Sequence, residues 1–200
     1  MKTRISKKTV KKAKKEISKK VKIEKPVKLE DVLKMQEKMN KNNKFSLINR
    51  ETGNLIHTLI KMKKPINVLE IGTSIGYSTL WIYSALDKNA KLTTIERWHE
   101  RAVLAGKFFK KANAKINLIE GDAILVLPKL NVRFDAVFID ATKKDYLKYL
   151  NLIKLETKSL VIADNTISHA EKMQDFLDFA NKTGAITLEV GKGLTIWNKN

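Results

Sequence analysis

Apolar side chains follow two different patterns along the chain, and the pattern changes near Pro65. Residues 29–41 and 51–62 repeat apolar side chains at helical spacing, which predicts two N-terminal helices. Beyond Pro65, short apolar runs alternate with amphipathic stretches. The runs predict strands at 66–71, 91–95, 116–119, 134–139 and 160–163, and the stretches predict helices at 77–86, 99–112, 123–129, 146–155 and 170–181.

Two more apolar runs end the chain, at 185–190 and 194–198, with a Gly-Lys-Gly turn between them. They predict an antiparallel hairpin. The five earlier strands alternate with helices, which is typical of a mostly parallel sheet covered on both faces. We therefore expect an α/β fold with a seven-stranded, mostly parallel sheet, helices on both faces and a C-terminal antiparallel hairpin.

Glycines and acidic residues stand at the ends of the first three predicted strands. Gly72 and Gly76 follow the first strand, Glu96 ends the second, and Gly121 and Asp122 follow the third. In open α/β sheets, ligands bind beyond the carboxyl ends of the strands. Glu96 could there accept both ribose hydroxyls and Asp122 could meet an adenine amine, which indicates a nucleoside site. The alternative is that both carboxylates only cap the helices that follow.

Oxygen-bearing side chains end the fourth and fifth predicted strands, where Asp140 and the pair Asp164–Asn165 stand. Neighbouring parallel strands would bring these tips together. Two carboxylates and an amide suit Mg²⁺ or Ca²⁺ rather than a soft metal, and the chain has no Cys. The alternative is a helix cap at Asp140 and a turn at Asp164–Asn165. Lys143, three residues after Asp140, would by itself be an ordinary solvated lysine.

Taken together and in order, six motifs resemble the class I methyltransferases, specifically the catechol and caffeoyl-coenzyme A O-methyltransferase-like family. They are VLEIGTSIGYS at 68–78, TIE at 94–96, EGDA at 120–123, FDAVFIDATK at 134–143, ADN at 163–165 and GLTI at 193–196. The resemblance covers about residues 45–198 and implies a Rossmann-like fold with S-adenosylmethionine as methyl donor. We expect a methyltransferase domain over 29–200, with N-terminal helices at 29–64 and a Rossmann-like core at 65–200.

The same resemblance implies roles for individual residues. The cofactor-binding set that it implies is Glu70, Gly72, Ser74, Gly76, Ser78, Glu96, Gly121, Asp122, Ala123 and Asp140. Asp140, Asp164 and Asn165 match the family's ligands for Mg²⁺ or another divalent cation such as Ca²⁺ or Mn²⁺, and Lys143 matches its catalytic lysine. Beside such a cation, like-charge repulsion would favour the neutral amine of Lys143, which could then accept a proton from a substrate hydroxyl.

Three features depart from the family pattern or lie outside it. Thr142 replaces an acidic residue between Asp140 and Lys143, which we expect to matter little. The predicted helix at 170–181 follows Asn165 closely, which predicts a short loop and an open pocket. We expect Trp81 and Trp98 to pack rather than to bind substrate.

The net charge of +19 favours a polyanionic partner. Residues 1–28 hold 13 Lys and Arg against two Glu, so we interpret them as a basic, flexible tail that could contact tRNA. The alternative is a merely solvated tail, since 35 of the 40 basic residues are Lys, and Lys lacks the bidentate geometry of Arg. No apolar stretch approaches the roughly 18 residues of a membrane span, and no secretory signal is visible, so we expect a cytoplasmic protein without membrane contact.

The open pocket and the basic tail narrowly favour 5-hydroxyuridine in tRNA as the methyl acceptor, since some members of the family methylate it. A small catechol or a coenzyme A ester is the alternative. A further alternative, of another class, is a non-catalytic nucleic-acid-binding protein on a methyltransferase fold. Relatives in this family are often dimers, so a homodimer is also expected.

Overall fold

The computed structural model describes residues 27–199, so the predictions for residues 1–26 lie outside it. Its centre is a seven-stranded sheet in the order β3-β2-β1-β4-β5-β7-β6. The first five strands in this order run parallel, and β7 is antiparallel to both of its neighbours. The strands are β1 (Asn67–Ile71), β2 (Lys91–Glu96), β3 (Asn117–Glu120), β4 (Phe134–Ile139), β5 (Leu155–Asp164), β6 (Ile186–Leu188) and β7 (Leu194–Asn198). The predicted fold class is confirmed.

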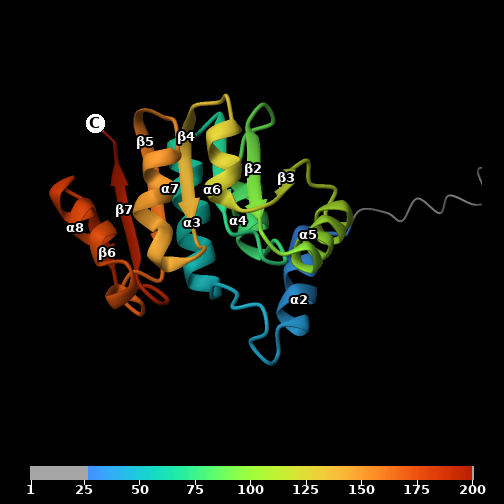
Figure 1. Ribbon diagram of the computed structural model, residues 1–200. Coiled ribbons are helices and arrows are strands. Elements are labelled where there is room, and N and C mark those ends of the chain that lie inside the picture. The colour runs from blue at the N-terminus through green and yellow to red at the C-terminus, as the bar shows by residue number, and fades with distance from the viewer. Residues whose placement is uncertain (1–26, 200) are drawn as a thin grey trace, which may run out of the picture.

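Helices cover both faces of this sheet, as Figure 1 shows. One face carries α6 (Ala123–Val126), α7 (Tyr146–Leu152) and α8 (Gln174–Lys182). The opposite face carries α3 (Arg50–Lys63) and α4 (Tyr77–Ala85), while α2 (Leu29–Met39) and α5 (His99–Lys111) lie toward the β3 end. Within residues 27–199, no helix has the length and apolar character required to cross a bilayer.

The central strand β4 shows why the sequence folds into this layered sheet. Its last four residues are apolar and almost completely buried, because both faces of the strand are covered. Val137 and Ile139 pack in the core beneath α6, α7 and α8, whereas Ala136 and Phe138 pack in the core beneath α3 and α4. A continuous apolar run is therefore the expected pattern for a strand in this position.

Hydrogen bonds and ion pairs hold the N-terminal helix α2 at the carboxyl end of the sheet. The buried Gln36 donates from Nε2 to the backbone oxygen of Ile75, 2.7 Å away in the loop after β1. Glu37 accepts a hydrogen bond of 2.6 Å from the hydroxyl of Tyr77 at the start of α4. Arg50 of α3 bridges to Glu30 and Glu37 at 3.0 and 2.9 Å. These contacts hold the segment between α2 and α3 near the ends of the strands.

Three predicted helix boundaries are wrong. The helix predicted to continue to Leu155 ends at Leu152, because Leu155 is buried and pairs with Phe134 as the first residue of β5. The helix predicted at 123–129 changes to a 3-10 turn at Leu127, next to Pro128, which lacks an N–H.

The third difference lies after Asn165. The segment predicted as one helix from Ala170 forms a 3-10 turn at Ala170–Lys172, and α8 begins only at Gln174. Residues 166 and 167 instead donate their N–H groups to the backbone of the turn between β6 and β7. That pairing fixes the segment as a turn, so a helix does not start almost at once after Asn165.

Candidate active site

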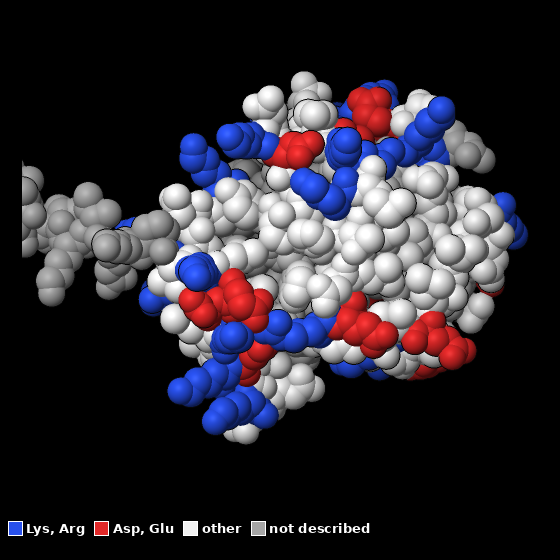
Figure 2. Space-filling view, turned by 180° about the vertical axis from the view of Figure 1, so that it is seen from behind, with Lys and Arg blue, Asp and Glu red and all other residues white. Residues whose placement is uncertain are grey.

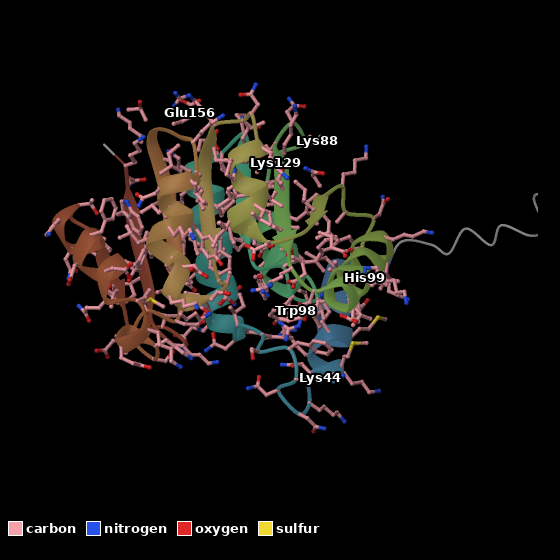
Figure 3. The ribbon with its side chains drawn as sticks, viewed as in Figure 1. Lys44, Lys88, Trp98, His99, Lys129 and Glu156 are labelled. Carbon is pink, nitrogen blue, oxygen red and sulfur yellow. The ribbon has the colours of Figure 1, made fainter. Side chains whose placement is uncertain are left out.

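A cavity of about 300 Å³ opens beyond the carboxyl ends of β1, β2, β3 and β4. Nearly all of the residues that the sequence assigned to a site line this one cavity. They are Gly72, Ser74, Ser78, Glu96, Gly121, Asp122, Ala123, Asp140, Lys143 and Asn165. In Figure 3 its rim can be located by Trp98, which lies beyond the end of β2.

Backbone hydrogen bonds fix the carboxylate of Glu96 at the end of β2. Its side chain is 4% exposed and lines the cavity. Oε2 accepts from the backbone N–H of Ser74 at 2.6 Å, and Oε1 accepts from the N–H of Trp98 at 2.8 Å. Two backbone donors fix the carboxylate, and its remaining lone pairs can accept hydroxyl groups from a ligand.

Asp122 at the end of β3 both caps a helix and lines the cavity. Oδ1 accepts from the N–H of Ile124 at 2.9 Å, so Asp122 does cap the helix that follows it. Oδ2 lies 3.9 Å from the guanidinium of Arg97, which also lines the cavity. The cap leaves Asp122 beside the cavity, where it can also meet a nucleobase.

Gly72 allows the tips of β1 and β4 to approach each other closely. Its φ of +98° lies in the region that side chains disfavour, and a Cβ at this position would overlap the backbone oxygen of Asp140. The glycine therefore brings the tip of β1 next to Asp140, where the polar groups of β4 and β5 begin.

Glu70 and Gly76 support the cavity from behind and do not line it. Glu70 is fully buried and accepts hydrogen bonds from the hydroxyls of Ser78 at 2.7 Å, Thr94 at 2.6 Å and Thr79. Burial raises the pKa of the Glu70 carboxyl to about 7, against the opposite effect of these donors. Gly76 precedes α4 at a φ of +85°, packed against the ring of Phe109. Glu70 therefore positions Ser78, which does line the cavity.

Asp140 and Lys143 form an ion pair at the opposite end of the cavity. Lys143 donates from Nζ to Asp140 Oδ1 at 2.8 Å, and both side chains are 18% exposed. Asp140 thus pairs with Lys143 and makes no helix-capping hydrogen bond within the described residues. The lysine is held where it can reach a bound substrate and is not a freely solvated surface residue.

Asp164 and Asn165 lie next to this pair, at the end of β5. Asp164 is 4% exposed, and its Oδ2 accepts from the amide nitrogen of Asn165 at 2.9 Å. Its other oxygen, Oδ1, is buried without a hydrogen-bond partner among residues 27–199. Burial, and then the negative charge of Asp140, raise the pKa of the Asp164 carboxyl. Asn165 has a φ of +64°, which turns the chain sharply at this point.

These residues fit a divalent cation. A buried, unpartnered carboxylate oxygen beside a second carboxylate is costly unless a positive charge compensates it. Asp140, Asp164 and Asn165 together offer the oxygen ligands that Mg²⁺ prefers. The described part of the chain holds no cluster of three or more His, Cys, Asp or Glu suited to a metal, so the Asn165 amide would have to complete the set.

Several cavity residues were missed by the sequence interpretation, and one prediction was wrong. Trp98 is 55% exposed at the cavity rim, with the Arg97 guanidinium 5.5 Å from its ring, so it does not pack into the core. Trp81 is buried as predicted. The position of Trp98, two residues after a strand end, was a usable signal. The remaining missed residues include Phe45, Ser46, Leu47, Arg97, Arg101, Tyr149 and Lys192.

A mostly parallel sheet covered on both faces, with a polar cavity at its carboxyl edge, defines an α/β protein of the kind that binds ligands beyond its strand ends. The family model described as O-methyltransferase matches residues 15–195, and the chain belongs to this family.

Relatives support this assignment over part of their length. The chain is 34% identical over 131 residues to catechol O-methyltransferase of Niastella koreensis, covering 62% of the chain and 59% of the relative. It is 30% identical over 144 residues to catechol O-methyltransferase B of Danio rerio, covering 66% and 54%. The chain thus spans about half the length of the curated relatives that it matches.

Solved structures share the fold over most of the chain. A Staphylococcus aureus protein, provisionally named a caffeoyl-CoA O-methyltransferase, is 28% identical with a TM-score of 0.76, covering 84% of this chain and 92% of that one. The S-adenosylhomocysteine-bound methyltransferase PaMTH1 of Podospora anserina has a TM-score of 0.77 at 21% identity, covering 100% and 99%. At that identity, the second likeness concerns the fold alone.

Proposed function

We propose that this chain transfers the methyl group of S-adenosylmethionine to a hydroxyl oxygen that has a second oxygen beside it. The observation that carries the proposal is the single cavity that joins Glu96 at one end with Asp140 and Lys143 at the other. A donor with its ribose at Glu96 would extend past Gly72 and Ser74 toward the ion pair. The acceptor would enter beside Asn165, so that both reactants lie in one cavity.

The residues of the chain have distinct tasks in this reaction. Glu96 holds the ribose, and the Nζ of Lys143, which lies 2.8 Å from Asp140 Oδ1, is the group that accepts the proton of the acceptor hydroxyl. The oxygen then bonds to the methyl carbon while the carbon–sulfur bond breaks, which leaves S-adenosylhomocysteine. A divalent cation at Asp140, Asp164 and Asn165 would supply Lewis acidity toward the two neighbouring acceptor oxygens.

We propose 5-hydroxyuridine in tRNA as the acceptor, in the cytoplasm. The net charge of +19 and the 13 Lys and Arg of residues 1–28 support an RNA substrate. Arg97, Arg101 and Lys192 line the cavity itself and add positive charge near its mouth. A small catechol is the second candidate, favoured by the names of the relatives in Niastella koreensis and Danio rerio.

The decisive experiment measures transfer of a radiolabelled methyl group, with Mg²⁺ or with EDTA. Catechol and tRNA that carries 5-hydroxyuridine are offered in parallel, with Asp140→Ala and Lys143→Ala as controls. Metal-dependent label in the tRNA supports the proposal, and label in catechol alone replaces it with the small-molecule reaction. Tight cofactor binding with label in neither acceptor would favour the non-catalytic nucleic-acid-binding alternative.

We also propose a homodimer. Figure 2 shows a broad uncharged area between two bands of charged side chains, on the face seen from behind. For so cationic a chain, an uncharged face is where two copies can approach without juxtaposing lysines. Light scattering should then give a mass of twice 22.8 kDa, and a mass of 22.8 kDa would contradict the dimer.

A further inference from the structure

Tyr146 is a buried tyrosine near the ends of β4 and β5 that no step of the proposed reaction uses. It is the first residue of α7, and its side chain is completely buried. Its hydroxyl donates a hydrogen bond of 3.1 Å to the backbone oxygen of Asp164. Its ring packs edge-on against the ring of Phe176 in α8, with 5.5 Å between the ring centres. Packing therefore fixes the ring, and a hydrogen bond fixes the hydroxyl.

The same hydroxyl lies close to the end of β4. Because β4 and β5 are paired up to their ends, Asp140 and Asp164 stand side by side at the edge of the sheet. Burial, and then the negative charges of Asp140 and Asp164, raise the pKa of the Tyr146 hydroxyl. A hydrogen bond from the backbone of Ala141 opposes this rise in the pKa. Together with the bond to Asp164, these effects put the hydroxyl between the two strand ends.

The ring of Tyr146 supports the ion pair that follows β4. The Nζ of Lys143 lies 5.7 Å from the centre of this ring and donates to Asp140 Oδ1 at 2.8 Å. An ammonium group at this distance is attracted to the face of an aromatic ring. The 3-10 turn Lys143–Asp145 directly precedes Tyr146, which brings the ammonium group and the ring together. One side chain thus contacts both the backbone of Asp164 and the partner of Asp140.

We propose that Tyr146 is a positioning residue for the divalent cation, and that its hydroxyl sets the spacing between Asp140 and Asp164. The inference rests on the proposed function for the cation itself. The two carboxylates repel each other, and a buried hydroxyl that is bonded to one strand end and close to the other holds them together. Groups that orient metal ligands in this way typically contribute about 10–100-fold to metal affinity.

Metal affinity, measured without an acceptor, provides the first test. Full-chain protein saturated with S-adenosylhomocysteine is titrated with Mn²⁺, and the bound ion is followed by electron paramagnetic resonance. Tyr146→Phe should raise the Kd for Mn²⁺ by about 10–100-fold, because it removes the hydroxyl and keeps the packed ring. Tyr83→Phe is the matched control, since Tyr83 is a partly buried tyrosine of α4 outside the cavity. It should leave the Kd unchanged.

A second measurement separates positioning from a general loss of structure. Calorimetry should give the same Kd for S-adenosylmethionine in the wild type, Tyr146→Phe and Tyr83→Phe. A parallel loss of Mn²⁺ and S-adenosylmethionine affinity in Tyr146→Phe would overturn the inference. In methyl transfer, kcat of Tyr146→Phe should recover at saturating Mg²⁺. A kcat that stays low there would give the hydroxyl a role other than metal affinity, which also overturns it.

The outcomes distinguish this inference from the proposed function. An equal Kd for Mn²⁺ in the wild type and Tyr146→Phe would overturn the role of Tyr146 and leave the proposed methyl transfer intact. A wild type that binds no Mn²⁺ would overturn both the cation and the role of Tyr146. A Kd that rises only in Tyr146→Phe supports the inference even if neither catechol nor tRNA accepts a methyl group.

Discussion

At the scale of single residues, the position of Lys143 determines which losses its removal should cause. Its Nζ is held by Asp140 where the proposed function places the acceptor, away from Glu96 and Asp122, where the proposed function places the cofactor. We expect Lys143→Met to lower kcat by about 10²–10⁴-fold, the usual contribution of a positioned acid or base. The Kd for S-adenosylmethionine should stay within about twofold, which calorimetry can check alongside the kinetics.

The neighbouring Lys144 is the control for this substitution, because it is exposed and outside the cavity. Lys144→Met should leave kcat unchanged. An equal loss of kcat in both variants would mean that positive charge, and not the position of Lys143, matters. An undiminished kcat in Lys143→Met would remove the lysine from the mechanism.

Glu70 should make the stability of the protein depend on pH. Its pKa is raised from 4.5 to about 7 in the folded protein, because the carboxyl is fully buried. The folded state therefore binds the proton more tightly than the unfolded chain does. The contribution of Glu70 to stability is full below pH 4.5 and is lost as pH rises through about 7.

Urea unfolding at pH 5 and pH 8, for the wild type and Glu70→Gln, measures this effect. Other titrating groups cancel when the two proteins are compared. From pH 5 to pH 8, the free energy of unfolding of the wild type should fall by up to about 3 kcal/mol relative to that of Glu70→Gln. A difference between the two proteins that is independent of pH would show that Glu70 is not protonated in the folded state.

At the scale of elements, Gly72 should be the residue on which the junction of β1 and β4 depends. Gly72→Ala forces a side chain into a φ of +98° and against the backbone of Asp140. A strained backbone of this kind costs on the order of 1–3 kcal/mol, and the overlap adds to that cost. We expect a lower urea midpoint together with weakened S-adenosylmethionine binding.

Gly106 offers a matched comparison within the helix α5. A Cβ there meets no atom within 4 Å, so Gly106→Ala should be neutral or should stabilise the protein by up to about 1 kcal/mol. Unaltered stability and cofactor binding in Gly72→Ala would contradict the role assigned to the close approach of the two strands.

The elements that the sequence predicted well are those whose pattern is determined by burial alone. β4 has a continuous apolar run because both of its faces are covered, which predicts a strand. α3 has apolar residues at helical spacing because only one of its faces is covered, which predicts a helix. The predictions failed at residues 153–155 and 170–173, where long-range partners decide the local structure. Leu155 pairs with Phe134, and Ile167 is bound to the turn that carries Lys192. No local pattern of side chains encodes those partners.

The same division applies to the site. Glu96 and Asp140 could be predicted because the carboxyl ends of parallel strands meet at one edge of a sheet. Phe45 and Lys192 follow none of the parallel strands. Phe45 lies between α2 and α3 and Lys192 in the turn between β6 and β7, so both reach the cavity only through the folding of the N-terminal segment and the last hairpin. Glu70 was assigned to the cofactor from the family pattern, but the structure places it beneath the cavity.

At the scale of the whole molecule, the charge is divided unevenly between the tail and the rest of the chain. Residues 1–26 hold 12 Lys and Arg and two Glu, a net charge of +10 out of +19. The remaining residues still carry +9, arranged with acidic residues among the bands of basic ones in Figure 2. If the substrate is RNA, the tail should supply most of the salt-sensitive attraction, while the cavity determines which nucleotide reacts.

Deleting residues 1–26 tests this division, because Val27 and Lys28 remain to contact α5 and to begin α2. Each phosphate contact contributes roughly 0.7–0.9 to the slope of log affinity against log salt. The full chain should therefore show a steeper slope for tRNA than the shortened chain does. Filter binding at about 50 to 200 mM salt, a range over which phosphate contacts change the affinity strongly, measures both slopes. The full chain and the shortened chain should have equal kcat/KM for catechol, since the deletion leaves the cavity unchanged. Equal slopes for tRNA would mean that the tail is only solvated and that the RNA proposal must rest on the cavity residues alone.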